Sequence, residues 1–350
     1  MKTIYKLLFF ILLIPKIGFS IDENHAYNKE KTLSKTYNVN SDAQINVSNS
    51  YGNVNVYLWD ENKISIQVSI KVSGNNEKKV NEKLSEIDVD FSASQSLVSA
   101  KTIFGNTNWR GGNLSYEINY IVKIPTNGSV DLLNKYGNIS MDKLMGSSTI
   151  NCQYGTINLG SLNNKSNSIN IAYSNNSSIS YVDKLNLKSQ YSDIEIQKVN
   201  QISIDGNYND FAFQNVGNLD IDTNYSKIKA NSIQKVNVNG NYLTMKLGEI
   251  GQSLVVSSNY TDIQLSASNK TDIITITGNY TNSKITCSQD YAFDIDVALK
   301  YGSFKDNLDI KTIEKVEKNT SFSLKGYHIN QGKSKIKVIT NYGSLQLLTK

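Results

Sequence analysis

The stretch LDIDTNYSKIKA at residues 219–230 carries the pattern that organises most of this 350-residue chain. Apolar residues alternate with polar ones on both sides of a central tyrosine, and the same frame reads ISIDGNYNDFAF at residues 202–213. Alternation at period two is typical of β-strands with one buried face. Short strands that return at a fixed interval are typical of a solenoid, whose turns bury a core only by stacking.

The central tyrosine recurs at nearly constant spacing, in steps of 17 to 21 residues. The tyrosines of this corner ladder are Tyr136, Tyr154, Tyr173, Tyr191, Tyr208, Tyr225, Tyr242, Tyr260, Tyr280 and Tyr301. Nine steps separate the first from the last. At the ~4.8 Å spacing of paired strands, they are expected to span ~43 Å of a rod, each tyrosine stacked over the next.

Asparagine and small residues precede the tyrosines. The asparagines of the ladder are Asn207, Asn224, Asn241, Asn259 and Asn279, and Asn341 stands in the same frame. Asn and Gly tolerate the left-handed backbone of a sharp corner, so these residues are expected to make the turn, with Asn side chains bonding from coil to coil. A structural stack is the simpler interpretation of the tyrosines. The alternative is an aromatic stripe that stacks on sugar rings.

Apolar residues recur three, five, eight, eleven and thirteen positions after each tyrosine. This frame places Ile228 and Ile204 inward and Lys227 and Asp205 outward, with the residue at the eighth position lining a third side. The expected fold class is all-β: a parallel β-solenoid, or single-stranded β-helix, of about 17–20 residues per coil, with an N-terminal β-rich cap containing one short helix.

The first twenty residues have the layout of a secretory signal peptide. Lys2 and Lys6 precede an apolar run too short to span a membrane, and cleavage is expected after Ser20. Removal of residues 1–20 takes away three lysines and lowers the net charge from +5 to +2. This charge is too small to indicate the basic surface of a nucleic-acid-binding protein. We therefore expect an extracytoplasmic protein of the periplasm, outer surface or medium, with no transmembrane segment in the mature chain.

The remaining chain divides into a cap and a solenoid. Residues 21–34 are expected to be disordered, residues 35–125 to form the cap, and residues 126–350 the solenoid. The cap is expected to contain a first copy of the corner at 49–56, an alternating strand at 63–72, a helix near 75–87, strands at 88–103 and 114–124, and a loop at 106–113. The solenoid is expected to bulge at 174–178 and to carry a hairpin-like excursion near 305–335.

Several of these strings together resemble a known group of bacterial proteins. NSYGNVNVYLWDENKISIQVSIKV, the following helix, NKYGNISM at 134–141 and the closing TNYGSLQL are similar to the DUF4097 group of adhesin-like domains, in the secreted form found in Bacteroidetes. The resemblance covers about residues 35–348. It implies a β-solenoid outside the cytoplasm and an adhesin role, and the group's association with envelope-signalling genes implies a part in envelope stress signalling. It supplies no catalytic residues.

Residues that could carry chemistry are sparse. Asp193, Asp210 and Lys227 are expected to be vertical neighbours on an outer wall, where a salt-bridged ladder explains them more simply than catalysis. His25 and His328 have no partner at metal-ligand spacing. Seven coils, or ~34 Å, separate the two cysteines, Cys152 and Cys287, so they are expected to be free thiols.

The sequence thus predicts no catalytic, cofactor-binding or metal-binding residues and no cofactor. The leading hypothesis is a non-catalytic extracytoplasmic protein that binds an envelope protein or glycan through the walls of a rigid solenoid. The alternative is a carbohydrate-active β-helix enzyme, a polysaccharide lyase or hydrolase, which would need acids converging on one wall.

Overall fold

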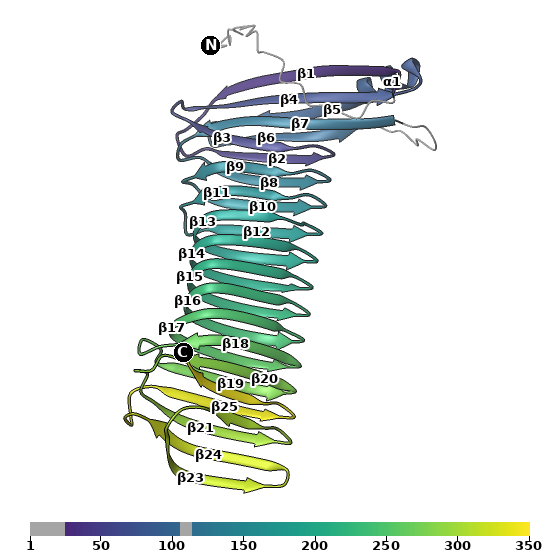
Figure 1. The fold of residues 1–350 in the computed structure, drawn as a ribbon. Coiled ribbons are helices and arrows are strands. Elements are labelled where there is room, and N and C mark those ends of the chain that lie inside the picture. The colour runs from purple at the N-terminus through teal and green to yellow at the C-terminus, as the bar shows by residue number, and fades with distance from the viewer. Residues whose placement is uncertain (1–24, 106–113) are drawn as a thin grey trace.

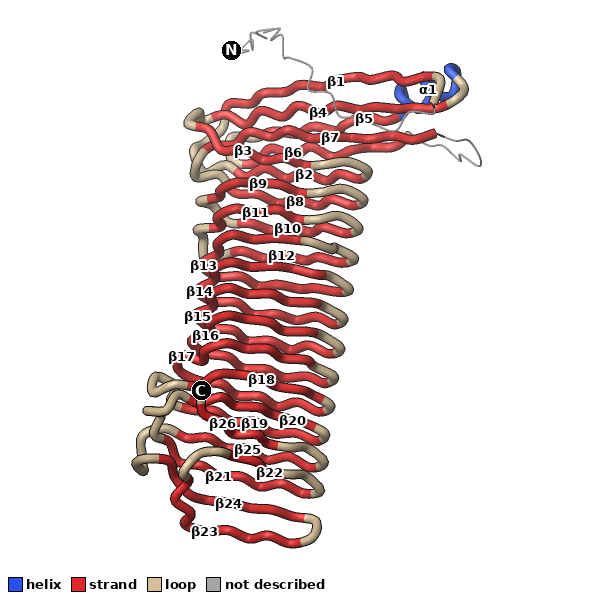
Figure 2. The backbone as a smooth tube through the Cα atoms, viewed as in Figure 1, coloured by secondary structure: helices blue, strands red, loops and turns tan. Residues whose placement is uncertain are grey.

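The computed structural model describes residues 25–105 and 114–350. In this part of the chain, strands wind into a rod of stacked coils joined in one extended, mostly parallel sheet (Figure 1). The expected signal peptide and the loop at 106–113 lie outside the described residues. Turns between the strands lie directly above one another along the rod (Figure 2), so each coil repeats the path of the one before.

Five long strands form the middle of the rod. They are β13 Ser177–Gln190, β14 Asp193–Asn207, β15 Asp210–Asn224, β16 Lys227–Asn241 and β17 Thr244–Asn259. From β14 to β16, each residue pairs with the residue seventeen positions later, as Ile204 does with Ile221 and Ile221 with Val238. The coil length read from the tyrosines is therefore the register of the sheet.

Each long strand bends twice as it rounds the coil. In β16, inward residues alternate with outward ones except at two steps, before and after Ile233, where the alternation slips by one residue. Ile233 is fully buried and lines a third side of the coil, as predicted. The interior is filled by aliphatic side chains, including Ile228 and Ile204, while Lys227 and Asp205 are exposed, so the predicted register is confirmed.

Shorter strands continue the two main sides of the coil towards the N-terminus. They are β2 Gln44–Ser50, β3 Val54–Trp59, β8 Ser129–Lys135, β9 Ile139–Leu144, β10 Ser148–Gln153, β11 Ile157–Leu162 and β12 Asn167–Ala172. The expected irregularity at 174–178 contains Asn176, which has a φ of 58° and precedes β13. The coil of β2 and β3 lies directly against that of β8 and β9, so the residues between them are an excursion from the rod.

The N-terminal end is covered by β1 Tyr27–Asn38, which precedes the first coil, and by the strands of that excursion, β4 Lys63–Gly74, β5 Ile87–Ala93, β6 Leu97–Phe104 and β7 Leu114–Pro125. These strands pair with one another antiparallel, while β6 and β7 join the first coil in parallel with β2 and β3. The expected disorder at 21–34 is wrong for residues 27–34, because they belong to β1 and pair with β4. The single strand expected at 88–103 is also wrong, because the chain turns back there to form the hairpin of β5 and β6.

The one helix of the described residues, α1 Glu77–Glu86, lies within the predicted span. Asn76 caps it by accepting a hydrogen bond from the Lys79 N–H, which satisfies one of the unpaired donors of the first turn. Val80 and, just past the end of the helix, Ile87 are fully buried, and Leu84 is half-buried against the core. No helix in the described part of the chain is long and apolar enough to cross a membrane.

At the C-terminal end, the order of coils departs from the order of the chain. The strands concerned are β18 Thr261–Ala267, β19 Ile273–Asn279, β20 Thr281–Cys287, β21 Phe293–Lys300, β22 Phe304–Asp306, β25 Lys335–Asn341 and β26 Leu345–Thr349. β25 pairs with β19 on one side and β21 on the other, and β26 lies likewise between β20 and β22. The last coil of the chain is therefore inserted between the two coils that precede it.

The predicted excursion forms an antiparallel hairpin of β23 Ile310–Lys318 and β24 Ser321–His328. β24 pairs with β21, so the hairpin extends the sheet at the end of the rod (Figure 1). β23 has one neighbour and carries exposed lysines and glutamates along its length. Charged edge strands resist pairing with other chains, so the rod is closed at this end as it is at β1.

Truncation of Ile228 to Ala should lower the free energy of unfolding by ~2–5 kcal/mol, because it leaves a cavity in the filled interior. Lys227→Ala, one residue away on the outer face, should cost less than ~1 kcal/mol. Urea unfolding followed by circular dichroism measures both. Equal losses would mean that inner and outer positions have been exchanged.

Candidate functional site on the tyrosine corner and the adjoining wall

Twelve tyrosines stack in one continuous column along a corner of the rod. Neighbouring ring centroids lie 4.7–5.2 Å apart and the ring planes within 13° of parallel. The column contains the ten predicted tyrosines together with Tyr51 and Tyr342. The expectation that Tyr301 follows Tyr280 is wrong, because Tyr342 of the inserted coil lies between them. Tyr136 and Tyr301 are thus ten steps apart, about 48 Å at the strand spacing.

Each of these tyrosines makes the corner itself. All twelve have φ between 50° and 63°, in the left-handed region. The expectation that the preceding asparagines adopt this conformation is wrong. A residue with a Cβ pays roughly 1–2 kcal/mol for left-handed backbone, and a stacked aromatic pair contributes about 0.5–1.5 kcal/mol, so the ring contacts offset much of the strain.

The asparagines instead form a chain of amide hydrogen bonds beside the column. The Nδ2 of Asn224 donates to the Oδ1 of Asn207 at 2.9 Å, and Asn241 donates in the same way to Asn224 at 3.1 Å. The contacts continue through Asn259 and Asn279 to Asn341 of the inserted coil. Bonding from coil to coil, as expected from the sequence, thus fixes the position of each successive corner.

The residue that follows most of these tyrosines faces inward. Ser192, Asn209 and Ser226 are buried, and their side-chain oxygens accept the N–H of the equivalent residue one coil earlier, at 3.1 Å in each case. Where this residue is glycine, as at Gly137, an added Cβ would lie 1.9 Å from the Gly52 carbonyl oxygen. Coils with glycine at this position and coils with another residue, such as Ser226 or Leu243, have the same left-handed tyrosine, so the turn is uniform along the rod.

The column leaves ring edges and hydroxyls at the surface but covers the ring faces. Tyr225 is 50% exposed, yet parallel rings lie against it on both sides. At the N-terminal end, Tyr116 meets the Tyr51 ring edge-to-face, and at the other end the Lys300 ammonium lies 5.6 Å from the Tyr301 ring centre. A sugar ring needs an open aromatic face to stack on, so the geometry favours the structural interpretation of the tyrosines over the sugar-binding stripe.

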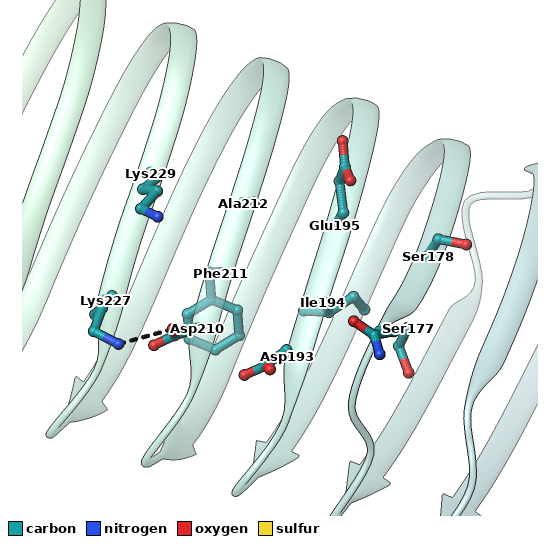
Figure 3. A pocket seen from close by; sticks show the side chains of 11 residues that line it. Ser177, Ser178, Asp193, Ile194, Glu195, Asp210, Phe211, Ala212, Lys227 and Lys229 are labelled. Carbon is teal, nitrogen blue, oxygen red and sulfur yellow. Dashed lines mark hydrogen bonds and ion pairs between the residues drawn. The ribbon is translucent and has the colours of Figure 1, made fainter.

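The wall that follows the corner carries the predicted charge ladder. Asp193, Asp210 and Lys227 are register partners on successive strands, and the Lys227 Nζ lies 2.9 Å from the Asp210 Oδ2 (Figure 3). This hydrogen bond and the charge of Asp210 raise the pKa of Lys227. Lys227 therefore pairs with Asp210, as the sequence predicts, on a solvated face.

A hollow of about 290 Å³ opens on this wall between Asp193, Glu195 and Lys229. Ala212 lies between Glu195 and Lys229 in the same outward row, and its small methyl side chain leaves the space open (Figure 3). Phe211 and Ile194 are buried beneath it. Sequence reasoning missed Glu195, Ala212 and Lys229, although their position four residues after a tyrosine could have placed them in one row.

Cys152, Cys287 and His328 are not brought together into one site. Cys152 and Cys287 are free and fully buried. Desolvation raises the pKa of the Cys152 thiol to about 11 and that of Cys287 to about 12. His328 is buried, with its Nδ1 2.9 Å from the Tyr291 carbonyl oxygen. Within residues 25–105 and 114–350, no three acidic, His or Cys side chains gather as a metal site would require.

No protein-family model matches the chain, and no curated protein matches it. Solved structures resemble it at low identity. A Clostridium sporogenes structure described as a "putative cell adhesion protein" is 10% identical, and the alignment covers 93% of this chain and 100% of that one, with a TM-score of 0.20. Two structures described as "putative adhesin" come from Parabacteroides distasonis (10% identity, 91% and 97% coverage, TM-score 0.34) and Bacteroides fragilis (11%, 91% and 97%, 0.28). The function is therefore argued from the geometry of the corner and the wall.

Tyr225→Ala should lower the free energy of unfolding by ~1–3 kcal/mol, because two stacked ring contacts are lost. Tyr225→Phe keeps both rings in contact and should change stability by less than ~0.5 kcal/mol. Tyr57→Ala, at an exposed tyrosine that stacks on no other ring in the described part of the chain, is the matched control. Urea midpoints decide the question, and an equal effect of Phe and Ala would assign the stability to the hydroxyl.

The buried thiols should make stability fall as pH rises above their ordinary pKa of 9.0. Above pH 9, the thiols of the unfolded state lose their protons while those of the folded state keep them. The free energy of unfolding therefore falls with rising pH until the folded thiols also ionise near pH 11–12. Denaturant unfolding of the wild type and a Cys152→Ala/Cys287→Ala variant across this window measures the difference in slope. The same dependence of unfolding free energy on pH in both proteins would contradict this prediction.

Proposed function

We propose that the chain is an extracytoplasmic parallel β-solenoid of the DUF4097 type that binds a protein or glycan of the cell envelope through its outer walls, without catalysis. The observation that carries this proposal is the tyrosine column, which with the amide chain makes one straight edge about 50 Å long at ~4.8 Å per coil. A rod held this way presents the same outward rows over many coils. Such a surface suits an extended partner.

The distribution of space in the molecule supports surface binding. Aliphatic side chains fill the coils from Ile45 to Leu347, while the hollow of Figure 3 lies on the outer wall. A secretory signal at residues 1–20 would deliver the rod beyond the inner membrane, where an adhesive surface meets its partners. The edge strands β1 and β23 carry charges, which keeps the rod from polymerising through its ends.

A carbohydrate-active enzyme is the second candidate because three carboxylates, Asp193, Glu195 and Asp210, surround the hollow of Figure 3. A glycosidase needs two free carboxyl groups that act as acid and base or nucleophile. Asp210 is paired with Lys227 at 2.9 Å on an exposed face, and Glu195 accepts a hydrogen bond from Gln214 at 3.4 Å. Of the three carboxylates, only Asp193 has no side-chain partner among the described residues. This arrangement favours a charged surface over a catalytic pair.

Purified residues 21–350 should bind at least one envelope glycan or protein and release no product from polysaccharides. Incubation with uronate-containing and neutral polysaccharides, followed by assays for unsaturated and reducing ends, tests turnover. Asp193→Asn and Asp210→Asn are the matched variants. Release of ends that either variant abolishes would establish the enzyme, and failure to bind any member of a broad envelope panel would overturn the binding function.

A further inference from the structure

A row of unpaired lysines runs along the wall of the rod, beside the tyrosine corner. Four positions after the tyrosine on successive coils, the register aligns Lys229, Lys246, Gln264, Lys284, Gln346 and Lys305. All six side chains are exposed. We call Lys229, Lys246, Lys284 and Lys305 the lysine row.

The lysine row departs from the way charges are arranged elsewhere on the rod. None of its four lysines forms an ion pair with another described residue. In other outward rows, a carboxylate has a partner on the next coil. Asn237 donates a hydrogen bond to Asp220 at 2.7 Å, and Lys227 forms an ion pair with Asp210. Lys229 and Lys246 are direct neighbours across two strands, and like charges in that position destabilise a sheet. A bound anion would remove this repulsion.

A second hollow, of about 350 Å³, lies within the row. Lys246 and Lys284 border it, together with Asn231, Gln264, Ser266 and Thr286, over a floor of Ala230, Leu247, Gly248 and Leu265. Its lining contains ammonium, amide and hydroxyl groups and no carboxylate. The carboxylates of Glu249 and Asp262 on the same strands accept hydrogen bonds from Ser268 and Asn282.

The backbone itself makes the hollow. The register between β17 and β18 shifts between Lys246 and Glu249, and such bulges redirect side chains. A Cβ on Gly248 would lie 2.0 Å from the Asn231 carbonyl oxygen, so the approach of the strands requires glycine there. The absent side chain leaves the polar groups open to solvent.

We propose that the lysine row and this hollow bind a linear acidic glycan that carries uronate carboxylates and lies along the rod axis; this inference rests on the proposed function. Ammonium groups pair with carboxylates through charge-assisted hydrogen bonds, while the amides and hydroxyls suit the hydroxyl groups of sugars. Cations at intervals of one or two coils favour a polymer with repeated charges. Single-stranded nucleic acid is less suited, because it needs open aromatic faces to stack on, and the tyrosine faces are covered.

Titration calorimetry of residues 21–350 with a galacturonate hexamer, at low and high salt, tests the proposal. Lys246→Gln/Lys284→Gln should weaken binding roughly tenfold or more, because two charge-assisted contacts are lost. Lys188→Gln/Lys235→Gln, which removes the same charge from exposed lysines of other outward rows that form no ion pair with another described residue, should leave affinity unchanged. Circular dichroism and urea midpoints verify that both variants fold. High salt should weaken wild-type binding.

Equal loss of affinity in the two double variants would overturn the proposal, because binding would then follow net charge alone. Binding of a single-stranded DNA oligonucleotide through the lysine row, without binding of the uronate hexamer, would also overturn it. Absence of uronate binding while another envelope glycan or protein still binds would refute this inference and leave the proposed function intact. Absence of binding to all of them would refute both.

Discussion

The structure depends on a coincidence between two distances. Parallel strands lie ~4.8 Å apart, and aromatic rings attract when their centroids are ~4.5–7 Å apart, so one tyrosine per coil can stack on the next without distorting the sheet. The observed ring spacing of 4.7–5.2 Å lies in both ranges. The column requires the same residue of every coil to turn the chain, which explains the left-handed tyrosines. It also fixes the register, because a slip of one residue would expose Ile228 and bury Lys227.

The period of the sequence correctly predicts the length of a coil and which of its residues are buried. It predicts the order of the coils only in part. Alternation around Tyr225 correctly places Ile228, and the slipped position at Ile233 marks the third side, because burial follows directly from the pattern. A repeat shows which residues are equivalent but not which coils are neighbours. Ile274, Ile336 and Ile295 occupy equivalent positions, and only the fold reveals that Ile336 lies between the other two. The strand β1 escaped prediction because an edge strand held by one neighbour buries little and has a polar sequence.

The parts of the candidate site that follow from strand register could be predicted from the sequence. The hollows, which depend on small side chains and a local bulge, could not. Lys227 follows Asp210 by one coil length, so their ion pair can be read from the sequence. The two hollows arise from Ala212 and from the bulge beside Gly248, which are local losses of side chain and register that the repeat pattern treats as ordinary variation. The conformational preferences of Asn and Gly also led to the wrong left-handed residue, because they do not include the ring stacking that a tyrosine gains at the corner.

The inserted final coil determines the order in which the rod can be completed. From Tyr136 to Tyr280, coils can be added in the order in which the chain emerges, because each new coil pairs with the coil before it. Beyond that point, the site beside β19 belongs to residues 335–341, about sixty residues later in the chain, as the bond between Asn341 and Asn279 shows. The coil of β21 and β22 reaches the rod only through this late segment. Pairing of residues 335–349 is thus the step that locks this end of the rod, which makes assembly all-or-none there rather than stepwise.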